Sequence, residues 1–300
     1  MKNKNSAAFG YFEIFAAGAL WGFIGFFTGK MGAAGATSAL TSTLRLACGA
    51  LVIIPLTALK SGIKAFKVSK REFICLLAIA VFSEALFNLC YTASIARVGV
   101  ACGAVLLYTS PIFVCIMSAM VFKEEIDGRK KLAILINFLG CVLTVTGGKF
   151  AGINFDALGV LLGVAAGFLY ATITIFGKFV SEVDSFVVTS YSFGIAALLI
   201  IVFTGSLGDF ALVQQPGKVV LLGVCYGVFS TIMPYLLYFD GLKKPVEASK
   251  VPVAASVETV VAAVSGALLM SEELTLAKWL GVALVMLSIA IMNIKKRKAQ

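Results

Sequence analysis

The sequence contains no histidine, and only 13% of its 300 residues are charged. The missing histidine excludes general acid–base catalysis by imidazole, Ser-His-Asp triads and His-ligated zinc. The seven cysteines show no CxxC spacing, which argues against a metal cluster or a disulfide framework. Most of them fall inside apolar blocks and are expected to act as small buried hydrophobes. We therefore expect neither a metal nor a cofactor.

Apolar residues are abundant instead, at 60% of the chain, whereas soluble domains contain about 45–50% apolar and about 25% charged residues. They occur in blocks of about 20 residues, the length that crosses about 30 Å of hydrocarbon. The pattern predicts an all-α polytopic membrane protein with ten transmembrane helices. We expect these spans at about 11–29, 37–59, 72–94, 99–121, 131–148, 157–178, 186–204, 218–239, 248–270 and 276–293.

Lysine and arginine are distributed unevenly between the two sides of these spans. With the N-terminus inside, nineteen of the 25 basic residues fall on the cytoplasmic side, chiefly in segments 60–71, 123–131 and 295–298, and five fall on the other side. Because basic residues accumulate in cytoplasmic loops, both termini are predicted to be cytoplasmic. The net charge of +10 is then a topology signal and indicates no nucleic-acid partner.

The two halves of the chain resemble each other at an offset of 147 to 149 residues. The segments 16–21, 81–83 and 124–126 match 165–170, 228–230 and 272–274 in the same order. The sequence therefore predicts two five-helix repeats, at 1–148 and 149–300, the second with a basic cytoplasmic tail. Because five is odd, the second repeat starts on the opposite side and the repeats are inverted, which favours a carrier over a channel or a membrane enzyme.

Several short motifs resemble the EamA repeats of the drug/metabolite transporter superfamily. They are Ala17-Gly18-Ala19-Leu20-Trp21-Gly22, Arg45-Leu46, Thr109-Ser110-Pro111-Ile112-Phe113 with Phe122-Lys123-Glu124-Glu125, and Ala255-Ser256-Val257-Glu258-Thr259-Val260 with Glu272-Glu273-Leu274-Thr275. The resemblance implies a ten-helix carrier of a bacterial inner membrane, with spans five and ten peripheral to a central cavity. Thr259 departs from the family, which often has proline there, so the kink of span nine is expected at Pro252.

Three ionisable residues lie within spans: Arg45, Glu84 and Glu258. Because such a group costs at least about 2.5–3.5 kcal/mol on insertion scales, it usually faces a cavity or a partner. Glu84 lies on one helix face with Asn88 and Tyr91, and the equivalent face of the second repeat carries Thr231, Tyr235 and Tyr238. These two stripes are expected to face each other across the axis that relates the repeats.

A midplane substrate pocket is predicted from these positions, with Glu84 and Glu258 as candidate proton-coupling groups and proline kinks opening the helices. Arg45 could bind a substrate carboxylate or neutralise an acid structurally, and the tyrosines could bind a cation or only join helices. The candidate binding residues are Trp21, Arg45, Glu84, Asn88, Tyr91, Tyr108, Ser110, Tyr170, Tyr235, Tyr238 and Glu258, and the expected kinks are Pro111, Pro234 and Pro252.

The function predicted from the sequence is export or exchange of a small metabolite by alternating access. Amino acids or related amphipathic compounds are the leading substrate class, because an intramembrane acid, a base and aromatic residues coexist. The alternative is a cationic amine, such as a choline-like or quaternary ammonium solute, favoured if Arg45 is buried against an acid. An enzyme is not expected, because nucleophile–base and metal-ligand spacings are missing. Coupling to protons and assembly as a homodimer are left open.

Overall fold

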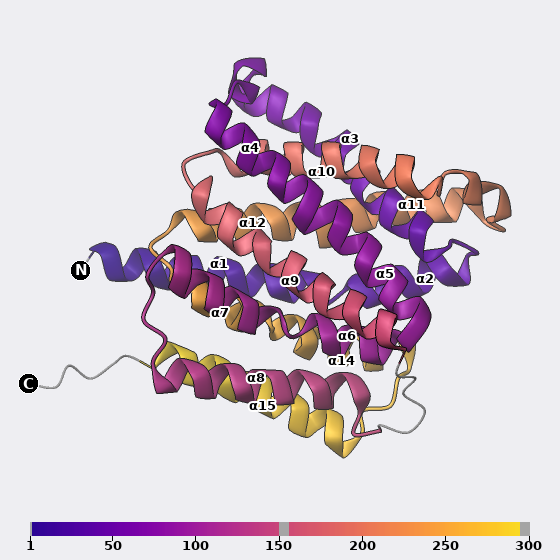
Figure 1. The fold of residues 1–300 in the computed structure, drawn as a ribbon. Helices are drawn as coiled ribbons and strands as arrows, with labels where there is room; N and C mark the ends of the chain where they lie inside the picture. Colours follow the sequence, from indigo (N-terminus) through magenta and orange to yellow (C-terminus); the bar gives the residue numbers. More distant parts are fainter. Residues whose placement is uncertain (1, 150–155, 295–300) are drawn as a thin grey trace, which may run out of the picture.

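The computed structural model describes residues 2–149 and 156–294, and within these ranges the chain forms helices and turns with no strand. Nine of the described segments are long and apolar enough to cross a membrane (Figure 1). They are Asn5–Ala33, Ser38–Ser61, Lys70–Val98, Val100–Val121, Ala157–Phe179, Ser185–Thr204, Pro216–Lys243, Ala248–Met270 and Leu276–Asn293. The predicted all-α polytopic fold is confirmed.

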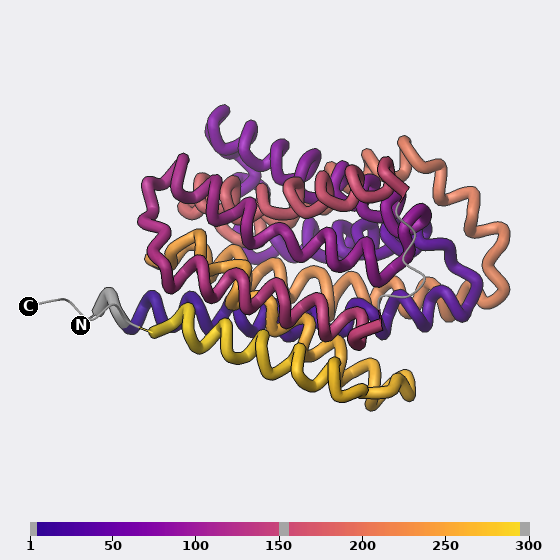
Figure 2. The backbone as a smooth tube through the Cα atoms, turned by 60° about the horizontal axis from the view of Figure 1, so that its bottom comes forward, coloured from indigo at the N-terminus to yellow at the C-terminus, as the bar shows by residue number. Residues whose placement is uncertain are grey.

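The remaining predicted span corresponds to α8 (Gly128–Thr146), whose first turn contains Arg129, Lys130 and Lys131. It lies along α15 (Leu276–Asn293) at one edge of the molecule (Figures 1 and 2). The two helices approach so closely that a Cβ atom on Gly140 would lie 2.9 Å from the carbonyl oxygen of Gly281. This pair is the peripheral one that the family resemblance implied.

Polar residues in the loops define where several helices begin. The side chain of Thr37 accepts a hydrogen bond from the N–H of Leu40 and starts α3 (Ser38–Ser61). Asp156 and Asp184 do the same for α9 (Ala157–Phe179) and α10 (Ser185–Thr204). Such caps satisfy N–H groups that have no partner within the first helical turn, so the spans begin close to the predicted positions.

Helices of the first half pack mainly on helices of the second half. α1 (Lys2–Trp21) lies against α12 (Met233–Lys243) and α13 (Val251–Ala255), α5 (Phe87–Val98) lies against α9, and α3 lies against α10 (Figure 2). At the α1–α13 contact a Cβ atom on Gly18 would be 2.3 Å from the carbonyl oxygen of Ala255, so only glycine permits this approach. The two halves are therefore interleaved.

Matching irregularities interrupt the spans of the two halves. The span 70–98 contains α4 (Lys70–Ala78), a π-helical segment (Ile79–Leu86) and α5, and the span 216–243 contains α11 (Pro216–Gly227), a π-helical segment (Val228–Ile232) and α12. Both π segments include the repeated triplets at 81–83 and 228–230. Extra residues of this kind often occur at functional sites.

The span 100–121 breaks between α6 (Val100–Leu107) and α7 (Ser110–Val121), and the span 248–270 breaks at Ser256, between α13 and α14 (Val257–Met270). Pro111 lies in the first turn of α7, directly after its break, and Pro234 lies in the first turn of α12, with one residue between it and the second π segment. Pro252 was expected to mark the kink of span nine. The structure corrects this: Pro252 lies in the first turn of α13, where proline needs no N–H partner, and the interruption is at Ser256.

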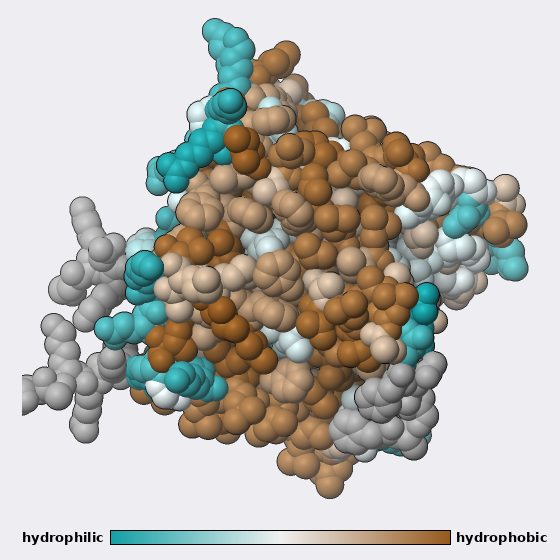
Figure 3. Space-filling model, in the orientation of Figure 1, coloured by the Kyte–Doolittle hydropathy of each residue, from teal (hydrophilic) through white to brown (hydrophobic). Residues whose placement is uncertain are grey.

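The first span also breaks, at Gly22 and Phe23 between α1 and α2 (Ile24–Ala33), whereas the equivalent α9 continues through Tyr170. The face of the bundle shown in Figure 3 is largely apolar between its two ends. Large side chains such as Leu51, Leu161 and Leu198 are more than half exposed. A surface of this composition fits contact with lipid.

We call the end at which α1 begins and α15 ends the basic end. Its loops and helix ends carry Lys60, Lys64, Lys67, Lys123, Arg129, Lys243, Lys244 and Lys250. The prediction that both termini are cytoplasmic also rested on Lys2, Lys4 and the basic tail at 295–298. The tail lies outside the described residues, as do the side chains of Lys2 and Lys4.

Candidate functional site

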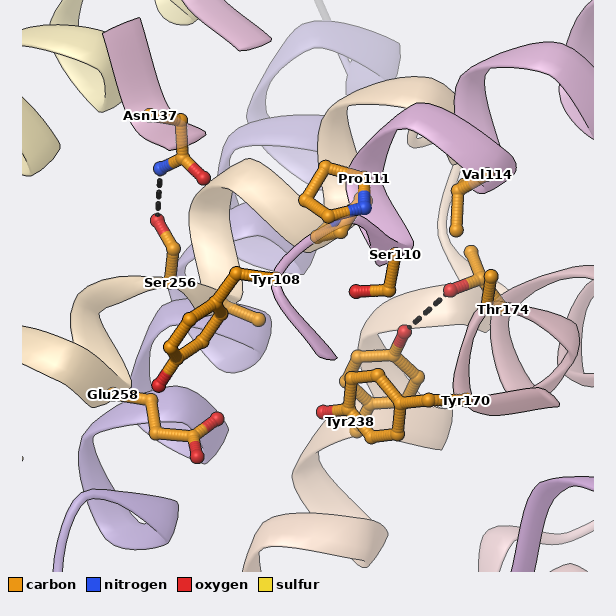
Figure 4. Close-up of a pocket in the computed structure, with 13 residues that line it drawn as sticks. Tyr108, Ser110, Pro111, Val114, Asn137, Tyr170, Thr174, Tyr238, Ser256 and Glu258 are labelled. Carbon is orange, nitrogen blue, oxygen red and sulfur yellow. Dashed lines mark hydrogen bonds between the residues drawn. The ribbon is translucent and has the colours of Figure 1, made fainter. Parts of the chain in front are cut away.

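A small cavity lies between the helices in the middle of the bundle, where the breaks in two spans meet (Figure 4). Its volume is about 30 Å³, far below the roughly 300–1,000 Å³ of ligand pockets. Five of the predicted binding residues line it, Tyr108, Ser110, Tyr170, Tyr238 and Glu258, together with the expected kink residues Pro111 and Pro252. We call this space the chamber.

Glu258 lies in the first turn of α14, directly after the break at Ser256, and its side chain is partly exposed to the chamber. Figure 4 shows its carboxylate directed into the chamber on the side of Tyr108, with Tyr170 and Tyr238 on the far side. Among the described residues no cation and no hydrogen-bond donor is paired with this carboxylate. Four tyrosines, at positions 91, 108, 170 and 226, and the thiol of Cys141 lie within electrostatic range of it.

Aromatic rings form one wall of the chamber. Trp21 is buried at the end of α1, with its ring centroid 5.3 Å from that of Tyr238 and 6.5 Å from that of Tyr170. The hydroxyl groups of Tyr238 and Thr174 are 2.7 Å apart, which fixes the orientation of the Tyr238 ring (Figure 4). Trp21 and Tyr170, which occupy equivalent positions in the two halves, are therefore in ring contact.

Arg45, Glu84 and Tyr235 form a separate buried cluster that does not line the chamber. Arg45 Nη2 lies 3.7 Å from Glu84 Oε2, and the Tyr235 hydroxyl donates a hydrogen bond to Glu84 Oε1. Glu84 is completely buried and Arg45 is only 7% exposed. The guanidinium also lies 5.8 Å from the ring centre of Tyr226. The structure thus places Arg45 against an acid, the arrangement in which a substrate carboxylate has least access to it.

The two predicted polar stripes meet at this cluster, since Glu84 belongs to the first and Tyr235 to the second. Asn88 does not reach across; its amide donates to the backbone oxygen of Glu84, 2.7 Å away on the same helix. Tyr91 stacks on Phe87 at a centroid distance of 5.7 Å. Neither Asn88 nor Tyr91 lines the chamber, although Tyr91 remains within electrostatic range of Glu258.

Sequence reasoning missed several residues of the region. Asn137 lines the chamber although it belongs to α8, the span that the family resemblance implied to be peripheral to the cavity. It donates to the hydroxyl oxygens of Ser256 and Ser288, at 2.6 and 3.0 Å. An amide within an apolar span was a usable signal for it. Tyr226 contacts Arg45, but its equivalent at an offset of 147 is Ile79, so comparison of the repeats gave no sign of it.

Two acids near the basic end form ion pairs. Glu13 Oε2 lies 2.5 Å from Lys244 Nζ, and Asp240 lies 2.9 Å from Lys243. Glu13 thus joins α1 to the residue that follows α12, whereas Asp240 and Lys243 both belong to α12. Neither acid lines the chamber. Within the described residues no group of three His, Cys, Asp or Glu side chains is placed to hold a metal ion.

Comparison with known families gives two matches along this chain. Residues 8–146 and 157–294 each match the EamA-like transporter family. An uncharacterized transporter of Archaeoglobus fulgidus is 27% identical over 83% of this chain and 84% of its own length. A second transporter of that organism is 30% identical over 73% of this chain and 77% of its own.

The uncharacterized inner membrane transporter YicL of Salmonella typhimurium is 22% identical over 96% of both chains. One crystal structure superposes with a TM-score of 0.78 over 97% of this chain and 98% of that chain, at 18% identity. That likeness concerns the fold. The names of these relatives give no substrate.

Proposed function

Because this chain belongs to the EamA-like transporter family, we propose that it carries a small organic cation through the membrane by alternating access, with Glu258 as the binding carboxylate. The observation that supports the proposal is the contrast between two acids. Glu84 is paired with Arg45, whereas Glu258 faces the chamber among tyrosines without a described cationic partner. A carboxylate at membrane depth is costly unless a cation or a proton neutralises it.

The rings around Glu258 suit an ammonium group. Tyr108 and Tyr170 line the chamber with it, and Trp21 lies behind them. A cation over an aromatic face gains about 0.5–2 kcal/mol, more when water is excluded. A substrate with one positive charge and an apolar body would satisfy both the acid and the rings.

Amino acids were the leading class in the sequence prediction, and that class needs a cationic group for the substrate carboxylate. The residue proposed for this role, Arg45, is held by Glu84 and Tyr226 outside the chamber. Among the described residues that line the chamber there is no lysine or arginine. The alternative of the sequence analysis, a choline-like or quaternary amine, therefore takes first place.

Transport requires the helices around the chamber to move. A cavity of about 30 Å³ is too small for a metabolite, since ligand pockets have volumes of roughly 300–1,000 Å³. Inverted repeats allow such a site to open to either side by rocking one bundle against the other. We propose the repeats 1–148 and 149–300 as these units, supported by the two family matches at 8–146 and 157–294.

We further propose that the protein lies in a bacterial inner membrane with both termini in the cytoplasm. The support is the gathering of lysines at the basic end, because positive loops remain on the cytoplasmic side, together with the similarity to an inner membrane transporter. Movement of substrate from this end to the other would be export. Glu258 can exchange its substrate for a proton, which makes exchange with protons the proposed coupling.

Binding to the purified protein tests the substrate class. The detergent-solubilised protein is heated with tetramethylammonium, choline, polyamines, amino acids or nucleosides, since a ligand of the folded state raises the unfolding temperature. We expect a rise of several degrees with choline-like amines, lost in Glu258→Gln and kept in Glu182→Gln, which removes an exposed acid. A rise only with amino acids, abolished by Arg45→Lys, would overturn the cationic proposal in favour of the zwitterion.

A further inference from the structure

The two ends of the bundle are closed to different degrees. At the basic end the carboxylate of Glu124, just after α7, accepts hydrogen bonds from the N–H groups of Ala248 and Ser249, at 2.6 and 2.9 Å, and from the Ser249 hydroxyl at 2.5 Å. Ala248 and Ser249 begin the ninth span and are completely buried. One acid thus joins the end of the fourth span to the start of the ninth.

A lysine makes a second junction beside it. Lys178, in the last turn of α9, donates to the backbone oxygens of Leu242 and Lys244, both at 3.0 Å. It joins the end of the sixth span to the end of the eighth. An anion at free N–H groups and a cation at free carbonyl groups both complement the helix dipoles, so both contacts are charge-assisted helix caps.

The inverted repeat supplies an equivalent set of residues at the other end. At an offset of 148, Glu124 corresponds to Glu272, Lys178 to Lys30, and Ala248 to Val100. The matched residues are in a different state: Val100 is 68% exposed where Ala248 is fully buried, and Lys30 is exposed. The Glu272 side chain is 51% exposed and pairs with Lys278 on its own side.

We propose that Glu124 and Lys178 form a latch that holds the basic end closed, and that Glu272 and Lys30 form the equivalent latch at the other end when the basic end opens. In that state Glu272 accepts hydrogen bonds from the N–H groups at Val100 and Ala101, and Lys30 donates to the last carbonyl groups of α5. The inference rests on the proposed alternating access and is independent of the substrate class.

The helix pair α3–α10 supplies the fixed part about which such a change can occur. Near the other end Thr37 donates to Asp209 at 2.6 Å, and the hydroxyl groups of Thr43 and Ser206 are also 2.6 Å apart. Near the basic end the hydroxyl groups of Thr57 and Ser190 are 2.8 Å apart. This pair is joined at both ends, whereas the fourth and ninth spans are joined at one.

Distance measurements between spin labels test the latch without any substrate. In a variant without the native cysteines, in lipid nanodiscs, labels at positions 121 and 243 report on the basic end, and labels at 100 and 269 report on the other. Glu124→Ala removes the charged cap, so we expect the population open at the basic end to rise about tenfold. Glu125→Ala, which removes the neighbouring acid, is the matched control.

The reciprocal variant is Glu272→Ala, which alters an exposed side chain and leaves the packed basic end intact. We expect it to reduce about tenfold the population closed at the other end. Unchanged distances in Glu124→Ala, or a shift of Glu272→Ala in the same direction as Glu124→Ala, would overturn the latch. If Glu124→Ala does not fold, Glu272→Ala decides alone. A latch that fails here while amines still bind leaves the proposed substrate class standing.

Discussion

The hydroxyl group of Tyr235 donates a hydrogen bond to the completely buried carboxylate of Glu84. Glu84 belongs to the first half of the chain and Tyr235 to the second, so this bond joins the two halves in the interior. Arg45 lies on the other side of the same carboxylate, 3.7 Å from Oε2. The three side chains form an acid, a base and a donor enclosed together, and their burial makes the cluster sensitive to loss of any one member.

Removal of the acid should destabilise the protein strongly. Glu84→Ala leaves the Arg45 charge buried without a counter-ion, and breaking a buried pair in this way costs about 3–5 kcal/mol. Glu84→Gln retains the shape and an acceptor for Tyr235, so the loss should be smaller. Thermal unfolding of the detergent-solubilised variants measures both, and equal unfolding temperatures for Glu84→Ala and the unaltered protein would show that Arg45 needs no partner.

Close packing of α1 on α13 gives a second prediction. Gly18→Ala places a Cβ atom 2.3 Å from the carbonyl oxygen of Ala255, so α1 must move away from α13. Such strain costs about 1–3 kcal/mol. Gly25→Ala is the matched control, since nothing lies within 4 Å of its Cβ position, and it should be neutral or stabilising. Comparison of the two unfolding temperatures checks the contact; similar values would contradict it.

The ring of Tyr108, rather than its hydroxyl group, should determine binding of an amine. Tyr108→Phe keeps the aromatic face in the chamber and should bind nearly as well as the unaltered protein. Tyr108→Ala removes the face and should weaken binding about 2- to 30-fold, the equivalent of about 0.5–2 kcal/mol. Calorimetric titration with choline measures the two variants, and an equal loss in both would point to the hydroxyl group instead.

Proton coupling should depend on Glu258 and not on Glu84. Glu84 is sealed between Arg45 and Tyr235 and has no surface in the chamber, whereas Glu258 lines it. In liposomes, amine transport by Glu84→Gln should therefore still respond to a pH gradient, and the response should disappear in Glu258→Gln. Should both variants keep the response, neither carboxylate is the sole proton site.

The loop at Glu247 gives a prediction for the pH dependence of stability. Burial raises the pKa of Glu247, but the ammonium groups of Lys130 and Lys250, each 2.5 Å away, outweigh it and hold the pKa below the ordinary value of 4.5. A lowered folded-state pKa stabilises the protein above the unfolded pKa, and this contribution is lost as the pH falls through the folded pKa.

The Glu247→Gln variant should thus unfold about 1–2 °C below the unaltered protein at pH 7, because its partly exposed pairs contribute little. Below pH 4 the difference should shrink toward zero. Thermal scans from pH 7 to pH 3 measure it, and a difference that grows on acidification would reverse the assigned sign.

Much of this arrangement could be predicted from the sequence, because a span length and a helical face depend only on nearby residues. The stripes containing Glu84 and Tyr235 meet as expected. Contacts between side chains of the two halves were harder to predict from the sequence. Arg45 could equally have faced the chamber, and only the packing of α3 on α11 and on α10, which also lies against the first π segment, determines that it contacts Glu84 and Tyr226.

The break at Ser256 illustrates a second limit. The sequence analysis assigned the kink to Pro252, because proline within a helix has no N–H to donate to the carbonyl oxygen of the preceding turn. In the first turn of a helix, however, the backbone N–H has no partner within the helix, so its absence in proline breaks no hydrogen bond. Pro252 lies in such a turn, and its carbonyl oxygen accepts a hydrogen bond from the N–H of Ser256. Ser256 is instead held by the amide of Asn137, a contact with the edge helix that spacing along the chain does not reveal.

The apolar surface between the two ends determines how the protein behaves in solution. Side chains such as Leu51, Leu161 and Leu198 will be covered by detergent after extraction. The particle that elutes from a sizing column is then a mixed micelle larger than a 31.6 kDa chain, even when it contains one copy. Light scattering combined with absorbance separates the protein mass from the bound detergent, so the number of chains must be counted in this way.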